Sequence, residues 1–413
     1  MSRIRRPTVL VLVENVPLAR DHRLRKQTAS LVAAGYEVHV ICRRDPDNGL
    51  VDGVVVHDYP APPDAASKWG YVREYGVTFL WAALLTARLS ARTRVDVVQV
   101  CGAPDIWFPI AGLLRRRGAK VVYDQRDPSP ELFDARYGTE RSPLRPLLVS
   151  LERATHAVSD RVLTVNRSLA ATAVSRGGHD EGRVRVVGNG PVLASVARST
   201  ATPPLSLEQG SLCVWHGMMG PQDRLDLVVL AAAHVVHDLG RTDCRFVLLG
   251  DGEARGPAEQ LVVELGLQDH VRFTGWVPEA HVFAILAYAD IGIESNTDPL
   301  VSPVKVMEYM AFGIPVVAFD VLETRRLAEG AAVYAAPRDA ADLGRAVSSL
   351  LDDAAKRDRL GEVGRRRVED EVAWDHQAAT YLAVYREVLE PAHPRLTAIS
   401  GPDPTRGLPG AGA

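Results

Sequence analysis

Cysteine is scarce in this sequence, and the few cysteines lie far apart. The 413 residues contain only Cys42, Cys101, Cys213 and Cys244, and no two of them form a C-x-x-C pair. This spacing argues against a zinc site and against a disulfide framework. We therefore expect four small, buried, apolar side chains in a protein from a reducing compartment.

The sequence also lacks an excess of positive charge and any long apolar run. A net charge of −3 and a sequence pI near 6.5 argue against a dedicated nucleic-acid-binding protein. No apolar run approaches the length that spans a bilayer. The longest, residues 77–89, has the length of a buried core helix. A helix on a membrane surface, flanked by Arg88, Arg92 and Arg94, is the alternative.

Strand and helix patterns alternate along most of the chain, which is long enough for two domains. The first apolar run ends at Glu14, too early for a signal peptide, and predicts a β-strand. Strands rich in Val and Ile between helices predict two doubly wound α/β domains with parallel sheets. Strands are expected at residues 9–13, 38–41, 95–100, 120–123, 161–165, 184–187, 212–215, 245–249, 271–274, 291–294 and 316–319. Helices are expected at residues 21–34, 226–239, 256–265, 280–288, 305–312, 343–351, 354–369 and 374–389.

A change in composition at residues 197–210, which include Pro203 and Pro204, predicts a linker between the domains. We expect one Rossmann-like domain over residues 1–196 and a second over residues 211–373. A final helix over 374–390 precedes a tail at 391–413 that is rich in Pro, Gly and Ala, which is typical of disorder.

Residues 302–318 carry the most information in the chain. They predict a loop, a helix, a Gly–Pro stop and an apolar strand. Glu308 lies among apolar neighbours in that helix, and burying an unpaired charge is costly, so we expect a partner for its carboxylate. A sugar or ribose hydroxyl is a suitable partner. A solvent-exposed Glu on the polar face of the helix is the alternative.

This stretch resembles the nucleotide-binding element of glycosyltransferase family 4, the retaining GT-B enzymes. The resemblance implies a GT-B fold, with an acceptor-side first domain, a nucleotide-sugar-binding second domain and a final helix that crosses back to the first. It also implies that Glu308 holds the ribose hydroxyls of the donor. The adjoining residues Ser302, Pro303 and Val304 belong to the same donor-binding element.

Small residues at predicted strand ends are similar to further donor-binding turns of this family, where the backbone approaches the nucleotide. They are Gly217, Gly250, Gly252, Thr274 and Gly275. Many relatives carry two cations in the turn after Gly217, whereas this chain has Met218 and Met219 there. We expect Lys305, the helix start after Pro221 and Arg23 to compensate the donor phosphates instead.

Residues 121–132 resemble a first-domain segment of the family at the carboxyl edge of the sheet, where we expect chemistry. Arg126, Asp127 and Glu131 are the candidate catalytic residues. Relatives have a histidine where this chain has Arg126, and an arginine cannot shuttle protons near neutral pH. Glu131 would also suit the first turn of a helix. Relatives often carry a second Glu at the position of Leu300, which leaves the donor sugar open.

The resemblance implies a retaining transfer from a nucleotide-diphosphate sugar, with a UDP-sugar favoured, to a hydroxyl acceptor on a glycan, a lipid-linked carrier or a natural product. No cofactor and no metal are expected, and no nucleic-acid partner. We expect a cytoplasmic location, with peripheral contact at the inner membrane face as an alternative; the oligomeric state stays open. A catalytically impaired accessory protein and a sugar-nucleotide epimerase are the alternative functions.

Overall fold

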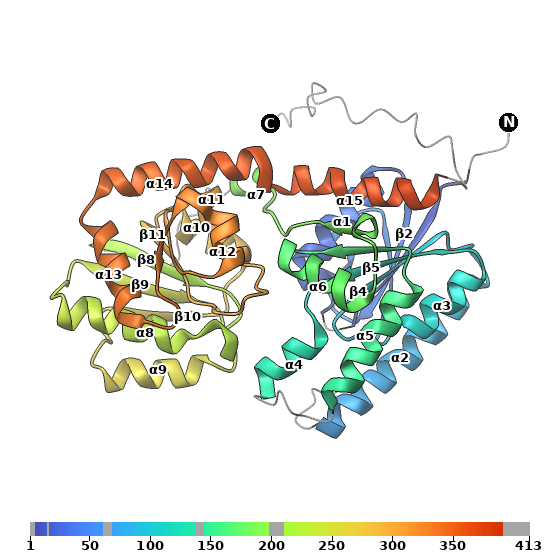
Figure 1. The fold of residues 1–413 in the computed structure, drawn as a ribbon, viewed down its shortest axis with the longest axis horizontal. Helices are drawn as coiled ribbons and strands as arrows, with labels where there is room; N and C mark the ends of the chain where they lie inside the picture. The colour runs from blue at the N-terminus through green and yellow to red at the C-terminus, as the bar shows by residue number, and fades with distance from the viewer. Residues whose placement is uncertain (1–4, 15, 61–67, 138–143, 198–209, 391–413) are drawn as a thin grey trace. The chain divides into compact units, whose positions relative to one another are not determined.

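The structure of the chain is a computed structural model that describes residues 5–14, 16–60, 68–137, 144–197 and 210–390 (Figure 1). The predicted tail and most of the predicted linker lie outside these residues, so the predicted domain boundaries stay predictions. The chain forms two compact units. One contains the described parts of Met1–Asp124, Ala154–Val162 and Ala379–Ala413, and the other those of Gln125–Arg153 and Leu163–Ala378.

The first sheet has seven strands in the order β3-β2-β1-β4-β5-β6-β7. Every residue of β1 and β4 is buried, as expected for Val-rich strands covered on both faces. The strand bounds are β1 (Thr8–Leu12), β2 (Glu37–Arg43), β3 (Val54–Tyr59), β4 (Val97–Gly102), β5 (Lys120–Gln125), β6 (Arg161–Thr164) and β7 (Val184–Val186).

Helices connect these strands. Asp21 caps α1, where its carboxylate accepts a hydrogen bond from the Leu24 amide at 2.8 Å. Their bounds are η1 (Leu18–Arg20), α1 (His22–Ala33), η2 (Asn48–Leu50), α2 (Lys68–Ser90), α3 (Phe108–Arg116), α4 (Ser129–Tyr137), α5 (Leu144–Val158), α6 (Arg167–Gly177), η3 (Glu181–Arg183) and α7 (Leu193–Ala197).

The second sheet has six strands in the order β10-β9-β8-β11-β12-β13. Strand order reverses between β8 and β11, and such a switch point opens a crevice at the carboxyl ends of the two strands. The strand bounds are β8 (Ser211–His216), β9 (Cys244–Leu249), β10 (Val271–Gly275), β11 (Ile291–Glu294), β12 (Val316–Phe319) and β13 (Ala332–Ala335). The two parallel α/β sheets confirm the predicted fold class, and the structure adds β3 and β13 to the predicted strands.

Helices also separate the strands of the second sheet, and none of the described helices is long and apolar enough to cross a membrane. Their bounds are η4 (Pro221–Asp223), α8 (Leu225–Ala233), η5 (His234–Asp238), α9 (Arg255–Glu264), α10 (Glu279–Leu286), α11 (Val304–Ala311), α12 (Leu322–Ala328), η6 (Glu329–Ala331), α13 (Ala340–Leu351), α14 (Ala354–Arg367), η7 (Val368–Val372) and α15 (Trp374–Leu389).

A buried polar network ties α15 to β4 and α1 within the first unit. The side-chain oxygen of Gln99 accepts hydrogen bonds from the hydroxyls of Tyr381, at 2.7 Å, and Tyr385. The amide nitrogen of Gln99 donates to Gln27 at 2.9 Å. All four side chains are fully buried. Gln99 therefore joins the three elements, and the Tyr381 hydroxyl also donates to that of Tyr385 at 3.0 Å.

We expect Gln99→Leu to lower the free energy of unfolding by about 3 kcal/mol, because it removes the donor to the buried Gln27 oxygen and the acceptor that the two tyrosine hydroxyls share. Urea unfolding followed by circular dichroism measures this change. Gln260→Leu is the matched control, since Gln260 is exposed on α9. Equal stability of the two variants would show that the network does not hold α15 in place.

Candidate functional site

Glycine turns bring the carboxyl ends of β8, β9 and β10 together. Gly217 and Gly250 have φ angles of +144° and +134°, which other residues rarely adopt. A Cβ atom on Gly250 would lie 1.9 Å from the Gly217 carbonyl oxygen, so no side chain fits there. The Gly250 amide donates to the Gly275 carbonyl at 3.0 Å. The three predicted turns therefore meet at one edge of the sheet.

Gly252 and Thr274 complete these turns. Gly252 has φ +152°, and a Cβ atom there would lie 2.5 Å from the Met219 carbonyl oxygen. The Thr274 hydroxyl donates to the Gly275 carbonyl at 2.8 Å, so its local role is to fix the turn. The close packing explains why small residues are needed here. A donor-binding role for each of these residues stays a prediction.

The predicted helix with one carboxylate is α11. Pro303 precedes its first residue, and the Val304 amide donates to the Ser302 carbonyl at 2.9 Å. Val306, Met307, Tyr309 and Met310 are buried, whereas the Val304 side chain is exposed. The Ser302–Val304 segment thus forms the turn that starts the helix.

Glu308 lies beside His216, the last residue of β8. Its side chain is 20% exposed, and one carboxylate oxygen is 3.2 Å from His216 Nε2. That nitrogen is buried and has no hydrogen bond of good geometry among the described residues. Glu308 is therefore neither a surface residue nor a fully buried one. Its carboxylate keeps partial access to solvent at the end of a central strand.

His216 is neutral at physiological pH. Burial, followed by the nearby Lys305 ammonium, lowers the pKa of His216 from 6.5 to about 3. The imidazole ring meets the ring of Tyr309 edge-on, with centroids 5.2 Å apart. A neutral ring in this position offers one hydrogen-bond donor and one acceptor, and it adds no charge to the site.

Lys305 lies in a cage of one aromatic ring and two carboxylates. Its Nζ atom is 3.1 Å from the Asp223 carboxylate and 3.5 Å from that of Glu294, and it lies 4.7 Å from the centre of the Trp215 ring. Burial lowers the pKa of Lys305, but Glu294 and Asp223 outweigh burial and raise it above its usual value. Lys305 is therefore charged and already paired.

The two carboxylates of this cage are functional candidates that the sequence analysis missed. Glu294 ends β11, is 1% exposed, and accepts a hydrogen bond from the Asn296 amide at 2.8 Å. Asp223 lies in η4, just after the glycine turn of β8. The sequence did contain a signal for Glu294. An acidic residue at the end of a predicted strand of buried apolar residues requires a cation beside it.

The three candidate catalytic residues follow β5. Arg126 is half-buried and Asp127 is exposed. Glu131, in the first turn of α4, forms a bidentate ion pair with Arg176, at 2.6 and 2.9 Å, and also lies 3.5 Å from Arg145. These two arginines engage the Glu131 carboxylate, and such pairing suits a residue that positions α4. The catalytic roles of the three residues stay predictions.

Arg23 is buried in the first unit and paired with Asp124. Its guanidinium donates to the Asp124 carboxylate at 2.8 and 3.1 Å, and both side chains are at most 6% exposed. Gln27 donates to the same carboxylate at 3.1 Å. Arg23 is therefore already engaged in a buried ion pair, and its predicted contact with donor phosphate stays a prediction.

The site has no evident metal centre. Within the part of the chain that the structure describes, no three His, Cys, Asp or Glu side chains are grouped so that they could hold a metal ion. Glu294 and Asp223 already share an ammonium group, which occupies the place a cation would take. The expectation of a reaction without metal stays a prediction.

Two family models cover most of the chain. Residues 23–193 match the model described as "Glycosyltransferase Family 4", and residues 210–353 match "Glycosyl transferases group 1". The chain is 28% identical to 2-deoxystreptamine glucosyltransferase of Streptomyces kanamyceticus over 84% of this chain and 91% of that protein. It is 30% identical to MMP alpha-(1->4)-mannosyltransferase of Mycolicibacterium hassiacum over 40% of this chain and 41% of that protein.

Solved structures share the fold over nearly the whole chain. Sucrose-phosphate synthase from Thermosynechococcus elongatus has a TM-score of 0.78 at 19% identity, and the match covers 94% of this chain and 100% of the synthase chain. Anabaena HepE in complex with UDP and glucose has a TM-score of 0.72 at 15% identity, and the match covers 92% of this chain and 100% of the HepE chain. The fold, the two family models and the near full-length glucosyltransferase relative together place this chain in the GT-B glycosyltransferases of family 4 and group 1.

Proposed function

We propose that this glycosyltransferase moves a sugar from a nucleotide-diphosphate sugar, with a UDP-sugar favoured, to a hydroxyl acceptor, and that it retains the anomeric configuration. The observation that carries the proposal is the partly buried Glu308 carboxylate beside neutral His216, at the edge where the glycine turns meet. The UDP and glucose bound by the HepE protein support the choice of donor. The acceptor belongs to a glycan, a lipid-linked carrier or a natural product.

Glu308 is suited to hold the ribose of the donor. A carboxylate accepts hydrogen bonds from two adjacent hydroxyls, and charge-assisted hydrogen bonds of this kind are short and strong. Its partial burial lowers the local dielectric, which strengthens such bonds. His216 remains neutral, so it does not form a competing buried ion pair with Glu308.

In the proposed reaction, the bond between the anomeric carbon of the donor and the diphosphate oxygen breaks, and the diphosphate leaves with the electron pair. A bond from the acceptor oxygen to the same face of the anomeric carbon forms, and the acceptor hydroxyl loses its proton, for which Asp127 is the candidate base. Lys305 and Arg126 are the candidate groups that stabilise the charge on the leaving diphosphate, with no metal and no cofactor.

Incubation with a panel of sugar nucleotides tests the function directly. We expect slow hydrolysis of one donor, detected as free nucleoside diphosphate by mass spectrometry, and transfer when a hydroxyl acceptor is added. Proton NMR of the product should show the anomeric configuration of the donor. If the folded protein neither binds nor turns over any donor, it acts as an accessory binding protein instead.

Replacing Glu308 by glutamine removes the charge and keeps the shape. We expect Glu308→Gln to weaken UDP binding on the order of tenfold to a hundredfold, the scale of one charge-assisted hydrogen bond. Isothermal titration calorimetry measures the affinity. Glu264→Gln, which changes an exposed residue of α9, serves as the control. Unchanged affinity in Glu308→Gln would remove Glu308 from the donor site.

The neutral state of His216 predicts a pH dependence of stability. The folded protein resists protonation of His216 down to about pH 3, whereas the unfolded chain takes up a proton near pH 6.5. The contribution of the neutral His216 to the free energy of unfolding is therefore fully present above pH 6.5, and it is lost as the pH falls towards 3. At about pH 4.5 the loss amounts to about 2 to 3 kcal/mol.

Urea unfolding at neutral pH and at about pH 4.5 checks this effect by comparison of variants. We expect His216→Gln to lose less stability on acidification than the unmodified protein, because it lacks the group that titrates. His281→Gln, which changes an exposed histidine, should behave like the unmodified protein. A parallel decline in all three proteins would mean that His216 is not held neutral.

A further inference from the structure

Helices α2 and α3 cover the same face of the first sheet. The connections from β3 to β4 and from β4 to β5 step across the sheet in one direction, whereas the connection from β1 to β2 steps in the other. Because such crossovers are right-handed, α2 and α3 lie on one face and α1 lies on the opposite face. Figure 1 shows the same arrangement, with α2 and α3 together below the strands and α1 above them.

Helix α2 has its large apolar residues on the outside. Val77, Leu80, Trp81 and Leu84 follow the i, i+3, i+4, i+7 spacing of one helix face, and all four are exposed, Leu80 by 68%. The buried positions of the helix are mostly smaller, and include Thr78, Ala82 and Thr86. A helix that only covers a sheet has the opposite pattern, with its large apolar side chains against the core.

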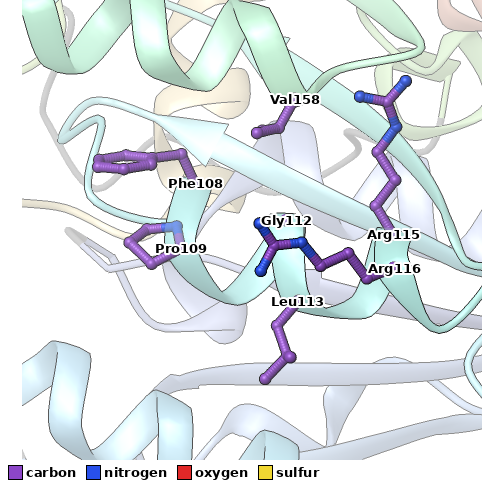
Figure 2. Close-up of a pocket in the computed structure, with 7 residues that line it drawn as sticks. All are labelled: Phe108, Pro109, Gly112, Leu113, Arg115, Arg116 and Val158. Carbon is purple, nitrogen blue, oxygen red and sulfur yellow. The ribbon is translucent and has the colours of Figure 1, made fainter.

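Helix α3 adds to this surface. Leu113 is 50% exposed and lines a cavity of about 670 Å³ (Figure 2). The other walls include Phe108, Pro109 and Val158, and Arg115 and Arg116 extend from the same helix. Arg115 lies 3.6 Å from Asp160, and Arg116 has no ion pair among the described residues. The cavity therefore combines apolar walls with guanidinium groups.

The exposed charges around these helices have a single sign. Between residues 73 and 125, all four acidic side chains are buried: Glu74, Asp96, Asp105 and Asp124. The exposed charged residues in that range are Arg73, Arg88, Arg92, Arg94, Arg115, Arg116 and Arg117. In α14, by comparison, the exposed Arg365 pairs with Glu369 and the exposed Arg366 pairs with Glu362.

Helix dipoles account for part of this pattern, since cations are favoured at helix C-termini. They do not account for an exposed row of Leu and Trp next to the arginines. A second copy of the chain docked face to face would bring two basic surfaces together, which repel one another. A basic surface with exposed Leu and Trp matches the chemistry of a bilayer that contains anionic lipids.

We propose that the outer face of α2 and α3 docks this enzyme on a membrane with anionic lipids. Leu80, Trp81 and Leu84 enter the boundary between headgroups and acyl chains, and Arg115 and Arg116 contact lipid phosphates at the mouth of the cavity. The contact is peripheral. It does not depend on the proposed donor site, whose residues Glu308, His216 and Lys305 lie in the second unit.

Sedimentation with vesicles tests this proposal on the full chain. We expect the protein to pellet with vesicles of phosphatidylcholine and phosphatidylglycerol, to bind vesicles of phosphatidylcholine alone much more weakly, and to be released in part by high salt. Absence of binding to the mixed vesicles, or equal binding to both kinds, would overturn the proposal. So would a dimer in solution that dissociates on substitution of Leu80 and Trp81, or capture of an acidic protein by this face without lipid binding.

Two double variants separate the apolar and the basic parts of the surface. We expect Leu80→Ser with Trp81→Ser, and Arg115→Gln with Arg116→Gln, each to weaken vesicle binding by roughly tenfold or more. The controls are Leu230→Ser with Val263→Ser, and Arg365→Gln with Arg366→Gln, all of which change exposed residues of the second unit. Circular dichroism confirms that each variant is folded. Equal binding by the test variants and their controls would exclude this face as the docking surface.

Discussion

The buried Glu294 carboxylate at the end of β11 is the constraint on which the geometry of the candidate site depends. A carboxylate that is 1% exposed needs a cation, and Lys305 from the first turn of α11 supplies it. That ion pair fixes the start of α11 against β11. Because Lys305 and Glu308 are three residues apart in one helix, the same pair sets the direction of the Glu308 carboxylate towards the end of β8. Asp223, the second anion on Lys305, ties the loop after β8 to the same point.

His216 links this ion cluster to Glu308 without adding charge. Burial and, after it, the Lys305 ammonium suppress protonation of the imidazole by lowering the pKa of His216. Three different groups therefore lie along one edge of the sheet. They are the Lys305 ammonium, which is paired with carboxylates, the neutral His216 ring, and the Glu308 carboxylate, which has partial access to solvent. Such an arrangement presents an acceptor of hydroxyl hydrogen bonds on a rigid base, which is the property that recognition of a ribose requires.

The sequence predicts what is local and misses what depends on strand order. The parallel sheets, the glycine turns and the lone carboxylate of α11 follow from short patterns, because each depends on neighbours within a few residues. The pairing of Arg23 with Asp124 joins positions 101 residues apart, and that of Lys305 with Asp223 joins positions 82 apart. Neither follows from periodicity. Strands β3 and β13, which lie at sheet edges and are only partly buried, were missed.

The charges of the site restrict how a diphosphate is held. Lys305 contributes one positive charge, and Glu294 and Asp223 contribute two negative charges within 3.5 Å of it. A phosphate that approaches Lys305 is therefore attracted by one group and repelled by two, so Lys305 alone is a poor phosphate ligand unless one carboxylate changes partner. In the proposed site, Arg126 is the candidate for the remaining compensation, since the amides of Gly217, Gly250 and Gly252 already donate hydrogen bonds within the turns. An arginine at position 126 would supply a cation that stays charged throughout the reaction and that can share the diphosphate with Lys305.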